Sequence, residues 1–399
     1  MKTKTRPSLG QLLESKCKRA RPVLGRVAVQ EFNEIKAWVP TGIYPLDLAI
    51  SGGRGLPTGR VGGVSSDPSL GKSLLGLHLG VAVQRAGGFF HLIDSEGTTQ
   101  LHFMEALGVD TSEARFAECP HGTLEDIFNY IDETASVHME YDSEMPVIYV
   151  WDSITQSPPA KVIDQGFEDL PKNVGLEARI ISSSMKKLSD KIRRSSIMLL
   201  VISQLRTRVS MDGMPVYGDK DTVTGGRALG FYDSYHLRLR SVSGGKIYLS
   251  KDDKDRRVHE QAGAQIEGFV KKSKIGPPFR KAFMPIYFEA REGHPVGVDV
   301  QEADLLWLKD RGFIKNYQGK DPDLKGAKAR ELRLPSGVDA FLGLAGWKSL
   351  YDEEGFSGGL HEFMRVNATM RGDRDAEAGV SEDLKEDAVS LEEELPDFE

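Results

Sequence analysis

Short, almost unbroken runs of apolar residues alternate with longer amphipathic stretches along the middle of the chain. Three of these runs are Phe89–Ile93, Val147–Trp151 and Ile197–Ile202. Apolar runs of this length without polar alternation are typical of strands that are buried on both faces. Between them, Gly175–Arg194 places apolar residues at helical spacing, which predicts an amphipathic helix. Strands that alternate with helices predict an α/β fold with a mostly parallel, twisted sheet.

The pattern changes in the last third of the chain. The runs Tyr235–Leu239, Lys246–Leu249 and Phe283–Phe288 have no long helical stretch between them, so they are expected to extend the sheet with antiparallel strands. A Gly/Pro turn near Gly293–Val298 then breaks the pattern. Residues 300–370 are expected to form a small α/β or helical domain that includes a helix at Glu302–Arg311.

The composition is that of a globular protein and excludes a membrane span. The 399 residues are 39% hydrophobic and 28% charged, and no apolar run approaches the roughly 18 residues that a spanning helix needs. The chain begins without the apolar run of a signal peptide. Only Cys17 and Cys119 are present, which argues against a disulfide framework or a zinc site. We therefore expect a cytoplasmic protein with no membrane partner.

The two ends of the chain carry opposite charge. Residues 1–36 hold nine Lys/Arg and three Glu, whereas residues 373–399 hold twelve Asp/Glu, Arg374 and Lys385. This asymmetry suggests a polyanion ligand and a tail that competes with it. The plainer interpretation is two solvated, disordered ends. Two apolar-acidic patches at Leu384 and Leu391–Phe398 suggest that the tail also docks a partner protein.

A phosphate-binding loop is the strongest local signal. An apolar run ends at Val64, and a helical pattern begins at Leu74. The loop between them is Ser66, Asp67, Pro68, Ser69, Leu70, Gly71, Lys72 and Ser73. In such a loop backbone N–H groups surround the phosphates, and Gly71 allows their close approach. Lys72 would offset the charge of the β and γ phosphates, and Ser73 would offer its hydroxyl to Mg²⁺.

The loop departs from the usual pattern at two positions. Ser66 stands where the pattern begins with Gly, and a Ser is strained if that position needs φ above zero. Pro68 has no N–H to donate. The competing interpretation is a surface turn that happens to contain Gly71, Lys72 and Ser73. The strand before the loop and the helix after it favour the phosphate loop.

A second strand supplies an acid for the metal. The run Val147–Trp151 ends in Asp152, which Ser153 follows. An acid at this place holds Mg²⁺ in P-loop proteins, although a lone Asp at the end of a strand is also a common turn residue. With the phosphate loop present, we predict ATP and Mg²⁺ as cofactors and Ser73 and Asp152 as the metal ligands.

Several short motifs follow one another in a fixed order between about residues 40 and 290. They are Thr41–Ile43, Leu46-Asp47, Gly52-Gly53, Leu56–Arg60, Asp94–Glu96, Leu107–Asp110, Gly175–Arg179, Ser203–Arg206, Thr224–Leu229, Phe231-Tyr232, Lys272–Ile275 and Pro278-Phe279. Together these motifs resemble the RecA family of ATP-dependent DNA recombinases. The altered phosphate loop and the ending Leu391–Glu399 resemble the phage recombinases of the UvsX kind.

The resemblance implies roles for five side chains besides Lys72. Glu96 would orient water for attack on the γ-phosphate, and Gln204 would couple the ATP state to the loop that follows it. Lys272 and Lys274 would act on the ATP of the neighbouring subunit, as an arginine finger does. Phe103 would stack on adenine. Each has a plainer interpretation: a loop carboxylate, a polar residue leaving the sheet, two solvent-facing lysines and a core aromatic.

Two long polar stretches, Asp164–Val174 and Thr207–Thr224, interrupt the core, and long loops inside an α/β domain are usually functional. By resemblance they are the DNA-binding loops. The basic residues in and around them that suit phosphates are Lys172, Arg179, Lys186, Arg206, Arg208 and Arg227. The resemblance further implies DNA contacts from the apolar Val174 and Val209 and from the closing residues Thr224, Gly225 and Gly226. Few aromatics occur here, so we expect little sequence preference.

The predicted organisation has four parts. A basic oligomerisation segment covers residues 1–36, a RecA-like ATPase core 37–290, a small C-terminal domain 291–372 and an acidic disordered tail 373–399. The expected protein is a DNA-dependent ATPase that forms a helical filament on single-stranded DNA and exchanges strands with a homologous duplex. The acidic tail would bind a single-strand-binding or mediator protein. The alternatives are a hexameric RecA-fold helicase and a non-catalytic, nucleotide-gated scaffold.

Overall fold

The structure is a computed structural model that describes residues 34–119, 121–163, 175–207, 221–223, 227–253, 256–290, 294–317, 329–335 and 337–371. Most of the segment 1–36, the first predicted DNA loop and the tail lie outside these residues. The same is true of the predicted DNA contacts Lys172, Val174, Arg208, Val209, Thr224, Gly225 and Gly226.

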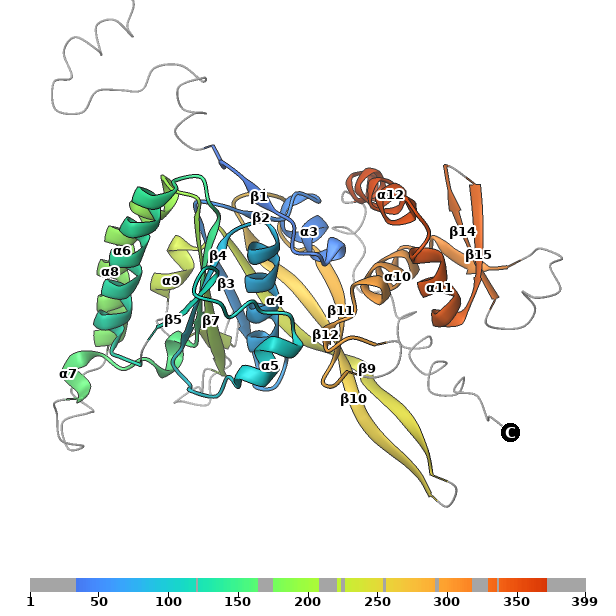
Figure 1. The fold of residues 1–399 in the computed structure, drawn as a ribbon, viewed down its shortest axis with the longest axis horizontal. Helices are drawn as coiled ribbons and strands as arrows, with labels where there is room; N and C mark the ends of the chain where they lie inside the picture. The colour runs from blue at the N-terminus through green and yellow to red at the C-terminus, as the bar shows by residue number, and fades with distance from the viewer. Residues whose placement is uncertain are drawn as a thin grey trace, which may run out of the picture.

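A large twisted sheet forms the centre of the chain (Figure 1). Its strands lie in the order β12-β11-β10-β9-β3-β7-β6-β4-β5, and β8 (Asp221–Val223) pairs with β7. The parallel part consists of β3 (Arg60–Ser66), β7 (Ile197–Thr207), β6 (Val147–Asp152), β4 (Phe89–Asp94) and β5 (Phe116–Glu118). The predicted parallel α/β sheet is confirmed, and the three apolar runs are β4, β6 and β7.

Helices cover both faces of this sheet, because successive side chains of each strand point to opposite sides. In β6, Ile148 and Val150 join the core cluster under α4 (Lys72–Arg85), while Tyr149 and Trp151 join the cluster on the other face. That second face is covered by the pair α6 (Leu124–Tyr141) and α8 (Leu176–Arg193) and by α9 (Arg227–Tyr232). The predicted amphipathic helix is α8. Three further short helices are α5 (Leu101–Ala106), α7 (Ala160–Ile163) and the 3-10 turn Ile154–Gln156.

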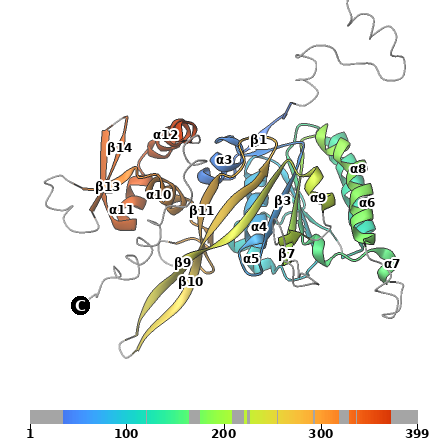
Figure 2. The ribbon, with the colours of Figure 1, turned by 180° about the vertical axis from the view of Figure 1, so that it is seen from behind.

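The antiparallel extension is confirmed, but it differs from the sequence pattern in one respect. The runs at 235–239 and 246–249 belong to a single long strand, β9 (Tyr235–Asp253), which pairs with β10 (Arg256–Ser273). Ser241 pairs with Ile266 and Lys246 pairs with Ala264, so residues 242–245 form a bulge opposite one residue of β10. The polar, glycine-rich break in the sequence is this bulge. Beyond it, the hairpin extends away from the sheet (Figure 2).

The edge of the sheet leads into a C-terminal part. After β11 (Lys281–Tyr287) and β12 (Gly297–Val298), the predicted helix forms as α10 (Val300–Asp310), where Asp299 accepts a hydrogen bond from the N–H of Glu302 at 3.0 Å. The remaining elements are β13 (Ile314–Asn316), β14 (Ala329–Leu334), β15 (Gly337–Leu342), α11 (Gly343–Tyr351) and α12 (Phe356–Arg371). They enclose a third apolar cluster around Trp347. The C-terminal part contacts α3 (Tyr44–Ser51), where Tyr44 stacks on His361 at 4.0 Å.

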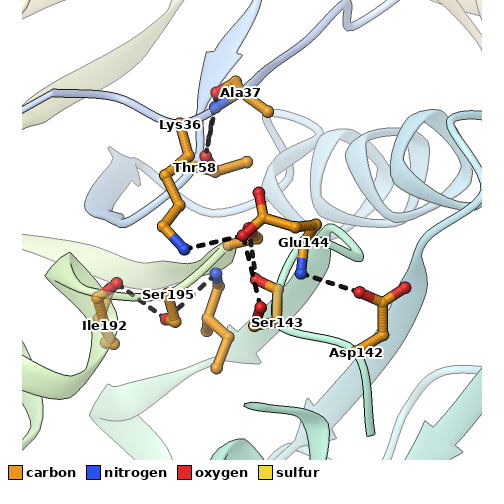
Figure 3. A network of polar contacts seen from close by, with 10 residues as sticks. Lys36, Ala37, Thr58, Asp142, Ser143, Glu144, Ile192 and Ser195 are labelled. Atoms are coloured by element: carbon orange, nitrogen blue, oxygen red, sulfur yellow. Dashed lines mark hydrogen bonds and ion pairs between the residues drawn. The ribbon is translucent and has the colours of Figure 1, made fainter.

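The first described residues contact the segments that precede the parallel strands β3 and β6 (Figure 3). The Ala37 N–H donates to Thr58 Oγ1 at 3.0 Å, and the Lys36 ammonium lies 3.1 Å from the Glu144 carboxylate. The pair β1 (Trp38–Val39) and β2 (Leu56–Pro57) continues this attachment. No helix among the described residues is long and apolar enough to cross a membrane.

Candidate nucleotide site

The predicted phosphate loop joins β3 to α4. Gly71 has φ 72°, a backbone conformation that would strain a larger residue, and a Cβ there would lie 2.8 Å from Ile286 Cδ1, so that methyl group would have to shift. Ser69 also has a positive φ, 61°. Asp67, Pro68 and Ser69 are exposed and Leu70 is half-buried against the core. The loop therefore presents its outer residues to solvent at the start of a helix, where phosphates are stabilised.

Ser66 does not adopt the positive φ that would strain a serine. It ends β3, pairs with Gln204 and is fully buried, and the positive φ angles fall on Ser69 and Gly71. Its hydroxyl accepts a hydrogen bond from Lys72 Nζ at 3.0 Å and donates to the Asp67 carbonyl at 2.6 Å. Lys72 Nζ also donates to the Asp67 carbonyl at 2.9 Å. Ser66 thus holds the loop lysine at the centre of the site.

The two predicted metal ligands lie together. The Ser73 hydroxyl lies close enough to the Asp152 carboxylate at the end of β6 to lower its pKa. Burial raises the pKa of Asp152 to about 6. The Ser73 hydroxyl and the charge of Lys72 oppose this rise, and the charge of Glu96 adds to it. Burial lowers the pKa of Lys72, against the nearby charges of Asp152 and Glu96. A hydroxyl beside a carboxylate is a pair of hard oxygen donors, which fits Mg²⁺ beside a phosphate.

Glu96 and Gln204 are in direct contact, although 108 residues separate them. Gln204 Nε2 donates to Glu96 Oε1 at 3.1 Å, and the Ser153 hydroxyl donates to the same oxygen at 3.1 Å. Ser66 and Asp152 end strands β3 and β6, and Gln204 lies in the intervening strand β7, three residues before its end. Glu96 follows β4 by two residues. The carboxyl ends of four neighbouring parallel strands therefore bring the predicted groups together.

Two supporting residues were not recognised in the sequence. The Asp94 carboxylate accepts hydrogen bonds from the N–H groups of Glu96, Gly97 and Thr99 at 3.1, 2.9 and 2.8 Å, which shapes the loop that carries Glu96. An Asp at the end of a strand followed by Gly is a turn signal that could have revealed it. The Ser153 hydroxyl had no such signal, because its contact with Glu96 depends on the neighbouring strand.

Phe103 lies in α5 and is half-buried against the core cluster under α4. This packing agrees with the plainer interpretation of a core aromatic, so its stacking on adenine stays a prediction.

The lysine pair lies on the face of the sheet opposite to α4. Lys272 Nζ donates to the carbonyls of Gly230 and Asp233, the latter at 2.8 Å, and Lys274 Nζ donates to the Phe231 carbonyl at 2.8 Å. These carbonyls belong to the end of α9, where cations are favoured. Burial and the charge of Lys274 lower the pKa of Lys272. Both amines reach the same place, as the spacing predicts.

The lysine pair also lies too far along the strands from the phosphate loop of the same chain to serve it. Lys272 pairs with His236, and His236 pairs with Gly63 of β3. Ser66 is three residues further along β3, which is about 10 Å at strand spacing. The two halves of the predicted active site thus lie apart in one chain.

The second predicted DNA loop leaves the sheet beside Gln204. Leu205 pairs with Val223, so the chain departs and returns through the adjacent strands β7 and β8. Arg206 lies in β7 and Arg227 begins α9, and their side chains are outside the described set. Arg179 and Lys186 are exposed on α8.

The phosphate loop, the acid at the end of β6 and the paired Glu96 and Gln204 define a P-loop nucleotide-binding protein with a RecA-type core. The protein-family model described as RecA N-terminal domain matches residues 15–292 of this chain. Protein RecA of Helicobacter pylori (strain G27) is 30% identical over 316 residues, which cover 77% of this chain and 84% of that protein.

Two further relatives give the same result. Protein RecA of Sulfurimonas denitrificans is 30% identical over 75% of this chain and 81% of its own length, and that of Campylobacter lari is 30% identical over 79% and 89%. The chain therefore belongs to the RecA family, whose members bind ATP and DNA in recombination and repair.

Proposed function

We propose that the chain is a recombinase that polymerises on single-stranded DNA as a helical filament, hydrolyses ATP there and exchanges strands with a homologous duplex. The contact between Glu96 and Gln204 at 3.1 Å is the observation that carries the proposal. It joins the proposed base for hydrolysis to β7, the strand from which the second loop departs. A change in the γ-phosphate that draws Gln204 away would therefore reach the predicted start of the DNA loop, Thr207, three residues later.

The remaining groups have distinct tasks in this scheme. Lys72 offsets phosphate charge, Ser73 and Asp152 hold Mg²⁺, and Glu96 orients the attacking water. Bound Mg²⁺ would neutralise charge that develops on the phosphates. The lysine pair completes the site of the next subunit, which its place on the opposite face of the sheet supports.

DNA would lie along the two loops. Arg179, Lys186, Arg206 and Arg227 belong to elements that flank them, and their charges suit backbone phosphates. Both single-stranded and duplex DNA are proposed ligands. The acidic tail would compete with DNA or dock a single-strand-binding or mediator protein, and the basic segment at the start of the chain would dock on the next subunit.

Phosphate release measured with and without single-stranded DNA, together with electron microscopy of the same mixtures, tests the proposal. We expect hydrolysis that depends on DNA and an open helical filament that forms with ATP. Gln204→Ala should retain ATP binding and lose the stimulation by DNA. Closed rings would support the hexameric helicase instead, and hydrolysis that ignores DNA in every condition would contradict the proposal.

A further inference from the structure

Three buried polar side chains form a connected chain beside the nucleotide site. His236 Nδ1 lies 2.8 Å from Asp233 Oδ2, and His236 Nε2 lies 2.8 Å from Ser65 Oγ. Ser65, His236 and Asp233 are 1%, 8% and 0% exposed. Because a carboxylate only accepts, Nδ1 donates to Asp233, and the Nε2 of a neutral ring accepts from the Ser65 hydroxyl.

The surrounding backbone makes room for this network. Gly63 faces the imidazole, and a Cβ there would lie 2.4 Å from His236 Nδ1 and 2.7 Å from Asp233 Oδ2. Any side chain at residue 63 would displace the ring. Asp233 Oδ1 is buried with no hydrogen-bond partner in the described part of the chain. The hydrogen bond from His236 to the other oxygen, Oδ2, therefore offsets part of the cost of burying this carboxylate.

The same three residue types activate a serine nucleophile in hydrolases. Here the Ser65 side chain lies inside the sheet, next to Ser66 and one strand from His236, where no substrate can reach its hydroxyl. The network therefore acts on the groups that it touches.

Those groups lead to the lysine pair. The Asp233 carbonyl accepts from Lys272 Nζ at 2.8 Å, and the Ser234 carbonyl accepts from the Lys274 N–H at 2.7 Å. On the other side, the Ser234 N–H donates to the Val61 carbonyl of β3 at 2.8 Å. The segment between α9 and β9 thus lies between β3 and the lysines, and His236 ties its aspartate to the residue before the phosphate loop.

We propose that Ser65, His236 and Asp233 are positioning residues that place Lys272 and Lys274 for the nucleotide of a neighbouring subunit. The inference rests on the proposed action of the lysine pair between subunits. Nothing in this role requires the three residues to touch the nucleotide.

The test uses the full-length chain with Ser65→Ala, which removes one hydroxyl and keeps the bond between His236 and Asp233. The second variant, His236→Gln, keeps a polar side chain and alters both bonds. Ser196→Ala is the matched control, because its buried hydroxyl also donates one bond, to the Ser143 carbonyl at 2.9 Å, away from this network. We expect kcat for DNA-stimulated hydrolysis to fall about 3- to 10-fold in the first two variants, the effect of one hydrogen bond. The Kd for nucleotide on the free subunit and the Tm should change little in Ser65→Ala.

Mixed filaments separate positioning from damage to the variant's own site. A Lys72→Ala subunit cannot use its own nucleotide but presents normal lysines. Adding it to Ser65→Ala subunits should raise the turnover per Ser65→Ala subunit, because the normal lysines then serve the intact phosphate loops. His236→Gln should respond in the same way, and it decides the matter if Ser65→Ala fails to fold.

The outcomes are distinct. Wild-type kcat in both variants, or a lower kcat that added Lys72→Ala subunits do not raise, would overturn the positioning role. Lys274→Ala titrated with Lys72→Ala subunits is the parallel measurement. If Lys274→Ala recovers and the network variants do not, only the positioning role fails. If Lys274→Ala does not recover either, the action between subunits fails as well.

Discussion

The nucleotide cradle and the lysine pair are two halves of one proposed active site, and they are built differently. In the cradle, side chains contact one another within the chain: Lys72 with Ser66, Ser73 with Asp152, and Gln204 with Glu96. Lys272 and Lys274 lie on the opposite face of the sheet, where backbone carbonyls hold their amines. If the lysines act between subunits as proposed, a single subunit binds nucleotide, whereas complete catalysis requires a neighbour.

This difference has a consequence for assembly. A surface that offers a cradle on one side and lysines on the other joins copies head to tail, and such contacts generate open helices or closed rings. Binding and hydrolysis should then be separable by mutation, which the following predictions use.

The largest effect is expected in the cradle. Lys72→Ala should lower ATP hydrolysis about 1000-fold, because the lysine compensates phosphate charge directly in a partly buried site. Phosphate release with saturating single-stranded DNA measures this loss. Lys187→Ala, on the exposed side of α8, is the control and should retain full activity. Normal hydrolysis by Lys72→Ala would show that the phosphate loop has been assigned wrongly.

The lysine half should respond differently. Lys274→Ala should lower DNA-stimulated hydrolysis about 100-fold while the free subunit binds nucleotide normally. Lys272→Ala should behave similarly, with some loss of stability because Lys272 also caps α9. Mixing either variant with Asp152→Asn subunits should restore part of the turnover at mixed interfaces. If no mixing ratio restores activity, the two halves do not meet between subunits.

Lowering the pH should weaken Mg²⁺ binding in the nucleotide cradle before it affects the lysine pair. Since burial raises the pKa of Asp152 to about 6, a proton occupies this proposed metal ligand at lower pH. Mg²⁺ affinity should be full above about pH 7 and fall about tenfold per pH unit below 6. The effect of Asp152 on the free energy of unfolding has the opposite pH dependence to its effect on Mg²⁺ affinity. Its raised pKa favours the folded state below the unfolded value of 3.8, and this stabilisation is lost as the pH rises through 6.

Mg²⁺ titrations of nucleotide-bound protein between about pH 5 and 8 would measure this change. Asp152→Asn should bind Mg²⁺ weakly at every pH, without the step near 6. A wild-type affinity that is flat across this range would contradict the assignment of Asp152 as a metal ligand.

The smallest effect concerns the predicted DNA contacts Arg206 and Arg227. Replacing Arg206 or Arg227 by Ala should reduce the salt dependence of single-stranded DNA binding by about 0.7 units of log–log slope for each lost phosphate contact. Arg365→Ala, in the C-terminal part, should leave the slope unchanged. Fluorescence anisotropy over a salt series measures it, and unchanged slopes for both arginines would place the DNA elsewhere.

Much of this molecule was predictable because its signals are local. The apolar runs at 89–93, 147–151 and 197–202 are too short for helices and lack polar alternation, and all three are strands. The phosphate loop follows from spacing alone, because the strand, loop and helix are consecutive in the chain. The bulge at 242–245 was not predictable, since a glycine-rich break looks the same whether a strand ends or bends there.

The sequence by itself determined the class of fold, the phosphate loop and the residue types that suit ATP, Mg²⁺ and DNA. The tertiary structure decided which of these residues meet. Strand order and register bring Gln204 to Glu96 across 108 residues and His236 to Ser65 across 171, and neither pairing has a local signature. The same register places the lysines on the opposite face from the cradle. Hydrogen bonds act only over about 3 Å, so contacts between distant residues exist only once the sheet has set the order of its strands.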